Sequence, residues 1–476
     1  MKFLNIEDNK ALKFTLIFLP LFLIFSRFLA DFYISCLALF FLTHCVYFKK
    51  LELKNTFVII LLIFYLYLLV NSFFSFDIKI SLTKSIPYFR FIFFSLVLTL
   101  IFLKNLDATN LLLKSFLVSH TILFLDSTLQ FYTGQNIYGS EILNGRVSSF
   151  FDDELVLGSY VAKCLPIILS LIILNKDKYS VKYEYYFIII SLIMSFYSSQ
   201  RVGFFSCVLI SIFYFSISVS YKKIFIFILI VVGGFYSASH LNSKNYDRLF
   251  VHTFEQFKSS TNYIWPSFRH ELHAATAISM FKDRIILGHG LYAFRYLCSD
   301  PKFVPKKLLK ENNYFYSPDE GIFLKENNSY YLIYSNGEKK ELSHKGFYFY
   351  ENSNKIGLKV KKGEKLFSNY EYPNGCNTHP HNFHIQFLAE LGIVGYLFLF
   401  IFFFYLLIEI SKFIFKGFVN KNYFSDMKKG YLISIFGLFL HLFPLIPSGN
   451  FFNNWISIIF YTNIALFLLY KKKAAL

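Results

Sequence analysis

The feature that most constrains this chain is a series of long apolar runs, each long enough to cross a lipid bilayer as a helix. A helix that spans the hydrocarbon core needs about 20 mostly apolar residues. By that measure the sequence contains about twelve spans, near residues 12–29, 31–48, 56–75, 86–103, 110–132, 155–174, 184–200, 202–219, 224–240, 383–410, 430–447 and 452–470. The sequence therefore predicts an all-α polytopic membrane protein with about 12 transmembrane helices.

The composition agrees with this prediction and excludes other classes. Of the 476 residues, 55% are hydrophobic and 16% are charged, whereas soluble proteins carry about 25% charged residues. A soluble enzyme, a disordered chain and a coiled coil are thereby excluded. The net charge of +18 does not indicate nucleic-acid binding, because the Lys residues flank the apolar runs as membrane topology would place them.

The Lys residues also predict an orientation. Positive residues accumulate in cytoplasmic loops, and with a cytoplasmic N-terminus the inner loops hold many Lys, from Lys49 to Lys473. The short outer loops then hold only Lys79, Lys84, Arg146 and Arg201. We expect an N-terminal bundle of about nine spans (1–240), a large outer loop (241–382) and about three C-terminal spans (383–476).

The outer loop is the part of the chain that can fold in water. Residues Pro266 to Leu287 place apolar side chains at helical spacing between charges, which predicts an amphipathic helix on the membrane surface. Alternating runs around Asn336–Gly337 indicate β-hairpins, and we expect a β-insert of about four strands near residues 320–365.

The six cysteines fall into two groups. Cys36, Cys45, Cys164 and Cys207 lie in predicted spans and are expected to act as small apolar packing residues. Cys298 and Cys376 bracket the β-insert in the outer loop. Outside the cytoplasm such a pair can form a disulfide, with two free thiols as the alternative.

Histidines concentrate in the outer loop. Nine of the twelve lie between residues 240 and 384, and His379, His381 and His384 crowd together just before a span. Three interpretations are open: an interfacial loop with incidental histidines, a metal site, or a neutral histidine that acts as a general base. We expect no metal, because no acidic residues lie nearby in the sequence to orient the ligands. The sequence lacks the G-x-x-x-x-G-K-[ST], G-x-S-x-G and H-E-x-x-H motifs, so ATP-driven work and serine hydrolysis are unsupported.

Arginines near the outer face suggest an anionic ligand. Arg201 lies where two spans meet, and Arg90, Arg146 and Arg269 are also expected near the outer face. A single arginine can simply contact a lipid phosphate, which suits Arg90. Several arginines that converge on one cavity would instead bind a diphosphate, because the guanidinium fork matches phosphate oxygens.

At these residues the sequence resembles a known family. The string HPHNFHIQFLAELGIVG (379–395) resembles the signature of the O-antigen ligase and O-antigen polymerase superfamily, with Glu390, Gly392 and Gly395 matching its Glu-x-Gly-x-x-Gly. Other stretches agree in order along the chain: NGRVSSFFDDELVLGSYVA (144–162), SSQRVGFFS (198–206), RHELHAATAISMFKDRIILGHGLYAFR (269–295) and FPLIPSGNFFNNW (443–455). Residues 300–375 are less typical.

The resemblance implies a C-type, inverting, metal-independent glycosyltransferase in the bacterial inner membrane, with its active site facing the periplasm and no cofactor. It would move a glycan from undecaprenyl diphosphate to lipid A-core or to a growing glycan. His381 would be the base with His379 in reserve, and Arg201 and Arg269 would hold the diphosphate. Arg146 and Asn382, which lie in matching strings, are further candidates for substrate binding.

Other functions remain to be compared with this one. A transporter of lipid-linked glycans should carry charged residues from both sides of the bilayer, whereas here the Arg and His set lies on the outer side. A non-catalytic polysaccharide protein would not need a His-Asn site. Ligase and polymerase share the donor and differ only in the acceptor, so the sequence does not separate them.

Overall fold

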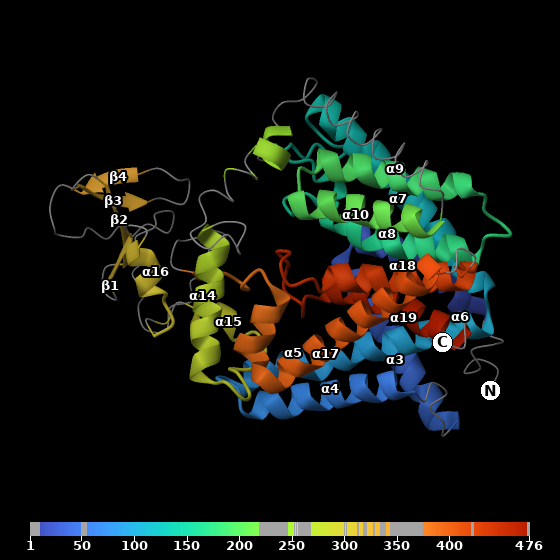
Figure 1. Cartoon of the computed structure of the whole chain (residues 1–476), viewed down its shortest axis with the longest axis horizontal. Helices are drawn as coiled ribbons and strands as arrows, with labels where there is room; N and C mark the ends of the chain where they lie inside the picture. The colour runs from blue at the N-terminus through green and yellow to red at the C-terminus, as the bar shows by residue number, and fades with distance from the viewer. Residues whose placement is uncertain are drawn as a thin grey trace.

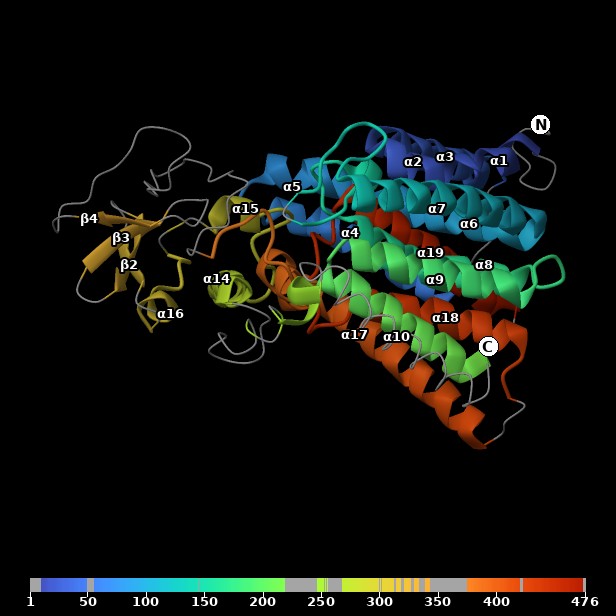
Figure 2. The same cartoon turned by 90° about the horizontal axis from the view of Figure 1, so that it is seen from above.

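The computed structural model describes residues 10–48, 55–143, 145–218, 246–251, 253, 255, 268–298, 300, 302–311, 314–317, 321–326, 329–333, 339–342, 375–419 and 423–473. Most of these residues form helices that pack side by side in one bundle (Figure 1, Figure 2). In chain order the bundle helices are α1 (Lys10–Thr15), α2 (Phe18–Phe25), α3 (Arg27–Phe48), α4 (Thr56–Phe73), α5 (Ile78–Ser85), α6 (Phe89–Lys104), α7 (Asp107–Thr133), α8 (Leu157–Leu174), α9 (Val181–Tyr197), α10 (Arg201–Ser218), α17 (Phe383–Val419), α18 (Asp426–His441) and α19 (Asn454–Lys473).

By length and composition, seven helical segments of the described chain qualify as membrane spans. They are Arg27–Phe48, Thr56–Phe73, Ile78–Lys104, Asp107–Thr133, Leu157–Leu174, Arg201–Ser218 and Phe383–Gly417. Four further predicted spans correspond to the shorter or less apolar helices α2, α9, α18 and α19. The predicted span at 224–240 lies outside the described residues. The chain is thus an α-helical polytopic membrane protein by its fold.

The outside of the bundle agrees with a lipid environment. Large apolar side chains such as Phe28, Val46, Leu125, Ile401 and Phe415 are exposed there, each with more than 60% of its surface free. A water-soluble protein seldom exposes apolar surface so extensively. We therefore take the sides of the bundle to face acyl chains.

Polar residues at the helix ends set where the bundle helices begin. Asn55 caps α4 by accepting a hydrogen bond from Val58 N at 2.8 Å, and Asp77 caps α5 in the same way from Ile80 N at 2.9 Å. A short 3-10 turn, η2 (Ile86–Tyr88), contains Pro87 and joins α5 to α6. This break places the end of α5 and the start of α6 beside each other at one end of the bundle.

The predicted amphipathic helix corresponds to α14 (Phe268–Asp283). Ile278, and Ile285 just after the helix, are exposed, as apolar side chains are on a helix that lies on a membrane surface. Leu272, Ala274, Ala277 and Met280 are buried together with the polar residues Glu271, His273 and Thr276. The helix packs against α17.

A four-stranded antiparallel sheet lies between α16 (Lys306–Glu311) and α17, in the order β1-β2-β3-β4. Its strands are β1 (Tyr314–Ser317), β2 (Gly321–Glu326), β3 (Ser329–Ile333) and β4 (Lys339–Leu342). The sheet starts before the predicted range of 320–365, and residues 343–365 of that range lie outside the described residues. Ile333 pairs with Lys339 on either side of Asn336–Gly337, itself outside the described residues.

The two ends of the bundle differ. Both chain termini lie at one end, whereas α14, α15 (Phe294–Leu297), α16 (Lys306–Glu311) and the sheet lie beyond the other (Figure 1, Figure 2). We call the latter the α14 end. The functional candidates described below are built on elements that meet there.

Candidate functional site

Four histidines gather at the α14 end, around His381. The ring centroid of His381 lies 4.2 Å from that of His379, 5.3 Å from that of His273 and 5.4 Å from that of His270. We call these four residues the histidine cluster. His270 and His273 come from α14, more than 100 residues before the loop that holds the other two. Their spacing of three residues puts both on one face of that helix.

The loop before α17 is held against α14 by several contacts. Cys298 and Cys376 are joined by a disulfide, with their Cα atoms 4.9 Å apart. Gly375 has a φ of +81°, and a Cβ atom there would overlap the Thr276 hydroxyl. Glycine is therefore required for this approach. Ser448 N donates to the carbonyl oxygen of His381 at 2.8 Å.

His381 has a backbone conformation that is rare for its residue type. Its φ is +55°, in the left-handed region, which costs a non-glycine residue about 1–3 kcal/mol and is found mainly where the surrounding structure imposes it. Such strained residues are frequent at functional sites. The disulfide, Gly375 and Ser448 supply the constraints that hold the loop in this form.

Asn377 defines the tautomer of His381. Asn377 Oδ1 accepts a hydrogen bond from Thr378 N at 2.6 Å, so the Nδ2 amide faces Nε2 of His381, 3.0 Å away. Because the amide can only donate through Nδ2, Nε2 of His381 is the acceptor and Nδ1 carries the proton. The basic nitrogen of His381 is therefore Nε2, which accepts a hydrogen bond from the Asn377 amide.

His379 and His381 are held neutral by their surroundings. Burial, together with His379, His273 and His270, holds the pKa of His381 well below its usual range. Burial, His273 and the guanidinium of Arg295 lower the pKa of His379 to about 3. A bound dianion would oppose both effects and raise the two pKa values.

Asn382 and His384 have structural partners. Asn382 Oδ1 accepts from Ile385 N at 3.2 Å, which caps α17, and Asn382 Nδ2 donates to the Pro444 carbonyl at 2.5 Å. His384 Nε2 lies 2.7 Å from the Leu442 carbonyl. Both side chains thereby fix the loop that precedes α19 against the start of α17. In this structure the Asn382 side chain thus contacts Ile385 and Pro444, and its predicted role in substrate binding stays a prediction.

The Glu-x-Gly-x-x-Gly segment also has a structural role. Gly392, with a φ of +64°, interrupts α17, and a Cβ atom there would overlap the Ile286 carbonyl oxygen. Gly290 N donates to the carbonyl oxygen of Glu390 at 2.7 Å. The buried Glu390 carboxylate accepts from Phe294 N at 3.3 Å and from the Gln386 amide at 3.0 Å. This segment locks the loop after α14 onto the break in α17.

The predicted arginines form a separate group. Arg201 Nε donates to the carbonyl oxygen of Arg248 at 3.0 Å, and Arg146 Nη2 donates to the Leu155 carbonyl at 2.9 Å. Burial and the charges of Arg248 and Arg201 lower the pKa of Arg146 to about 10. We call Arg146, Arg201 and Arg248 the arginine cluster. It is built on α10, on η4 (Asp247–Val251) and on the loop before α8.

Two further arginines bear on the prediction. Arg269 lies in the first turn of α14 next to His270, but its side chain is outside the described part of the chain. Arg295 was missed by sequence reasoning. Its guanidinium lies 5.0 Å from the centre of the Tyr292 ring and interacts electrostatically with His379. Arg295 closes the RHELHAATAISMFKDRIILGHGLYAFR string, which was the available signal.

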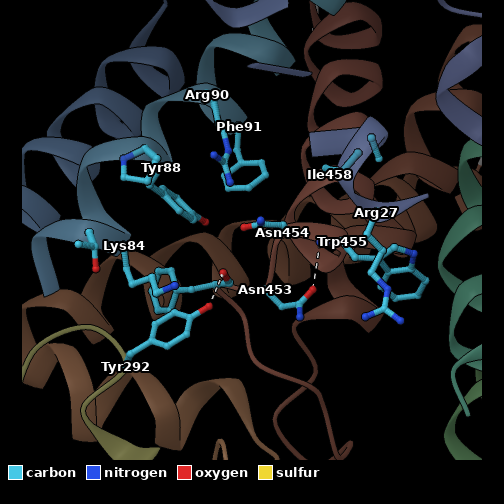
Figure 3. A pocket seen from close by; sticks show the side chains of 14 residues that line it. Arg27, Lys84, Tyr88, Arg90, Phe91, Tyr292, Asn453, Asn454, Trp455 and Ile458 are labelled. Carbon is cyan, nitrogen blue, oxygen red and sulfur yellow. Dashed lines mark hydrogen bonds between the residues drawn. The ribbon is translucent and has the colours of Figure 1, made fainter. Parts of the chain in front are cut away.

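A cationic cavity also opens at the α14 end. It has a volume of about 340 Å³ and is lined by Arg27, Ala30, Thr83, Lys84, Pro87, Tyr88, Arg90, Phe91, Tyr292, Phe452, Asn453, Asn454, Trp455 and Ile458. Figure 3 shows Lys84 and Arg90 reaching into it from one side and Arg27 beside Trp455 on another. Tyr292 lies between this cavity and Arg295, since Lys84 Nζ is 4.8 Å from the centre of its ring.

Within the described residues, no three His, Cys, Asp or Glu side chains are arranged to bind a metal. The sequence matches no known family model and no curated protein. The assignment of a function therefore depends on the residues and the geometry described above. These bring together His379, His381 and two α14 histidines in one place, and Arg146 with Arg201 in another.

Proposed function

We propose that the protein is an inverting membrane glycosyltransferase that transfers a glycan from undecaprenyl diphosphate to an acceptor at the outer face of the bacterial inner membrane. The observation that carries this proposal is the histidine cluster at the α14 end of an apolar bundle. A strained, neutral histidine with a basic Nε2 is suited to take a proton from a sugar hydroxyl. The lipid A-core acceptor of an O-antigen ligase is our first choice.

In this mechanism the acceptor hydroxyl displaces the Asn377 amide from Nε2 of His381 and donates its proton there. The hydroxyl oxygen then forms a bond to the anomeric carbon, and the bond from that carbon to the diphosphate oxygen breaks. The configuration at the anomeric carbon inverts because attack comes from the opposite face. The glycan is thus bonded to the acceptor oxygen, the proton is on His381, and the lipid diphosphate leaves with the electrons of the broken bond.

The leaving diphosphate gains negative charge as the bond breaks, so fixed positive groups lower the barrier. We assign this role to the arginine cluster together with Arg269. Arg295 acts on His379 and is the further positive group of the histidine site. A diphosphate that reaches the histidine cluster would raise the pKa of His381 toward the range in which a histidine is an effective base.

The topology belongs to the same proposal. We place both termini in the cytoplasm, about twelve spans in the membrane and residues 241–382 in the periplasm, because the Lys-rich segments lie at the end of the bundle that holds the termini. The histidine cluster then faces the periplasm, where lipid-linked glycans are used.

The test combines a strain and a purified enzyme. Deletion should remove capped lipopolysaccharide while the lipid-linked polymer accumulates. A cap of a single unit would instead assign the protein as a polymerase, and lipid-linked glycan trapped on the cytoplasmic side would assign a transporter. With purified protein in vesicles, His381→Ala should lower the transfer rate by roughly 10²–10⁴-fold and retain donor binding.

His379→Ala and the double variant complete the test. If only His379→Ala loses transfer, the base is His379. If the double variant transfers glycan at a normal rate, neither histidine is the base and the proposed mechanism fails. Inhibition by a chelator that Zn²⁺ reverses would replace it with a metal-dependent one.

A further inference from the structure

The cationic cavity carries an excess of positive charge. None of the described side chains that line it is acidic. Arg90 pairs outside the lining with Asp31 at 2.8 Å, and Arg27 pairs with Glu154. Lys84 lies over Tyr292. With three cations and two nearby carboxylates, about one positive charge is left for a ligand.

The cavity also holds hydrogen-bond donors that suit a phosphate. Arg90 lines the cavity with its guanidinium, and Lys84 lines it with its ammonium group. The side-chain amide of Asn454 lies close by (Figure 3). A guanidinium, an ammonium and an amide placed around one space provide donors from several directions. This arrangement matches the tetrahedral oxygens of a phosphate better than the two coplanar oxygens of a carboxylate.

A second cavity beside it is apolar. It has a volume of about 400 Å³ and is lined mainly by aromatic and aliphatic side chains, among them Phe64, Phe387 and Tyr461. The linings of the two cavities are in contact through aromatic side chains. The ring centroid of Tyr88 lies 5.5 Å from that of Phe452 and 6.1 Å from that of Tyr461, and the ring centroid of Phe387 lies 5.4 Å from that of Phe452.

A polar cavity with a cationic lining next to an apolar one matches the two parts of a lipid. We propose that the cationic cavity binds the phosphate headgroup of a membrane lipid, whose chain lies along the neighbouring apolar surface. Free phosphate has the same headgroup chemistry but would gain nothing from the apolar cavity. The site is distinct from the arginine cluster and the histidine cluster, and its existence does not depend on the proposed glycosyl transfer.

Lys84 is the best position for a test. It is exposed at the mouth of the cavity, so its replacement by glutamine leaves the packing of the bundle unchanged. Lys79 lies on the same helix, α5, is also exposed and is absent from the lining. Lys79→Gln is therefore a control with the same change of net charge.

Trp455 provides the signal. It lines the cavity, and the chain has 2 tryptophans, so Trp265→Phe in the full-length protein leaves Trp455 as the single fluorophore. Purified protein in a non-ionic detergent is titrated with dioctanoyl phosphatidic acid, dioctanoylglycerol and inorganic phosphate. We expect saturable binding of the phosphatidic acid, weakened roughly tenfold by Lys84→Gln and unchanged by Lys79→Gln.

Each other outcome counts against the proposal. Equal binding of dioctanoylglycerol would remove the role of the phosphate, and equal binding of inorganic phosphate would show a free-anion site instead of a lipid site. An equal loss in Lys79→Gln would reduce the effect to general charge attraction. Asn454→Ala should weaken binding as well, and unchanged affinity in both Lys84→Gln and Asn454→Ala would overturn the site.

Discussion

At the scale of single residues, the geometry around His381 explains how one imidazole can remain neutral and yet be ready to accept a proton. Asn377 directs its N–H to Nε2, while the neighbouring histidines disfavour a second proton on the ring. A sequence motif identifies the histidine, but the tautomer depends on Asn377, whose role no spacing rule indicates. His381 and its hydrogen-bonding partner Asn377 thus belong to one short loop.

The neutral histidines predict how stability depends on pH. His379 and His381 have lowered pKa values when folded, so the unfolded chain binds more protons as the pH falls below about 6.5. The free energy of unfolding should then decrease toward acid, by up to about 1.4 kcal/mol per pH unit for each histidine. Thermal unfolding in detergent between pH 7 and pH 5 measures this. The His379→Gln/His381→Gln variant should show a smaller decrease, and an identical slope would contradict the explanation.

Arg201 predicts a difference between arginine and lysine. Its Nε donates to the Arg248 carbonyl oxygen, and the proposed clamp depends on the planar fork of its guanidinium. Lysine keeps the charge but cannot provide two parallel donors. We expect Arg201→Lys to weaken donor binding about tenfold, as measured by the concentration dependence of transfer in vesicles. Donor affinity equal to that of the unaltered protein would remove Arg201 from the clamp.

At the scale of elements, the break in α17 fixes where the histidine loop lies. Gly392 and the loop after α14 approach each other through their backbones, so that Ile393 N donates to the Ile285 carbonyl at 2.8 Å. A side chain at position 392 would prevent this close approach. The Glu-x-Gly-x-x-Gly string is therefore a packing motif that supports the site from behind.

Gly392→Ala should destabilise the protein strongly. Alanine adds the cost of a positive φ, about 1 kcal/mol, and an overlap with Ile286 that costs about 1–3 kcal/mol more. Gly139 also has a positive φ, of +83°, but has open space around it. Gly139→Ala is thus the control, and its free energy of unfolding is expected to decrease only by the cost of the positive φ. Equal losses in chemical unfolding would show that the close approach is unimportant.

The disulfide predicts a second effect at this scale. Cys298 and Cys376 are separated by 78 residues, and closing a loop of that length restricts the unfolded chain by up to about 4 kcal/mol. The Cys298→Ser/Cys376→Ser variant should unfold at a lower temperature than the parent protein and gain nothing from oxidising conditions. Cys36→Ser, at a free and exposed cysteine, is the control. Alkylation of both thiols without a reductant would show that the bond is absent from the purified protein.

At the scale of the whole molecule, the proposed orientation places the α14 end in the periplasm. Tyr138 lies in the loop that joins α7 to α8 and is 71% exposed. Asp177 is also exposed and follows the other end of α8. In a background without the four free cysteines, Tyr138→Cys should react with a membrane-impermeant maleimide in intact spheroplasts. Asp177→Cys should react only after lysis. The reverse pattern would invert the topology and remove the histidine cluster from the periplasm.

The sequence alone determined the class of fold, because runs of about 20 apolar residues have few alternatives to helices in a membrane. It also indicated the pair Cys298 and Cys376, and the histidines His379 and His381, since these residue types stand out in a chain so poor in polar groups. The packing of α14 against α17 could not be predicted, because apolar periodicity does not mark a face of small and polar side chains.

Only the tertiary structure decided which distant residues meet. His270 and His273 contact His381 because α14 packs on the start of α17. Arg27, Lys84 and Arg90 surround one cavity because the beginnings of α3 and α6 lie beside the last turn of α5. Local spacing records neighbours on one helix but carries no information on contacts between segments 100 residues apart. The roles of Asn377 and Asn382 depend likewise on hydrogen bonds that form only once the loops have folded against α17.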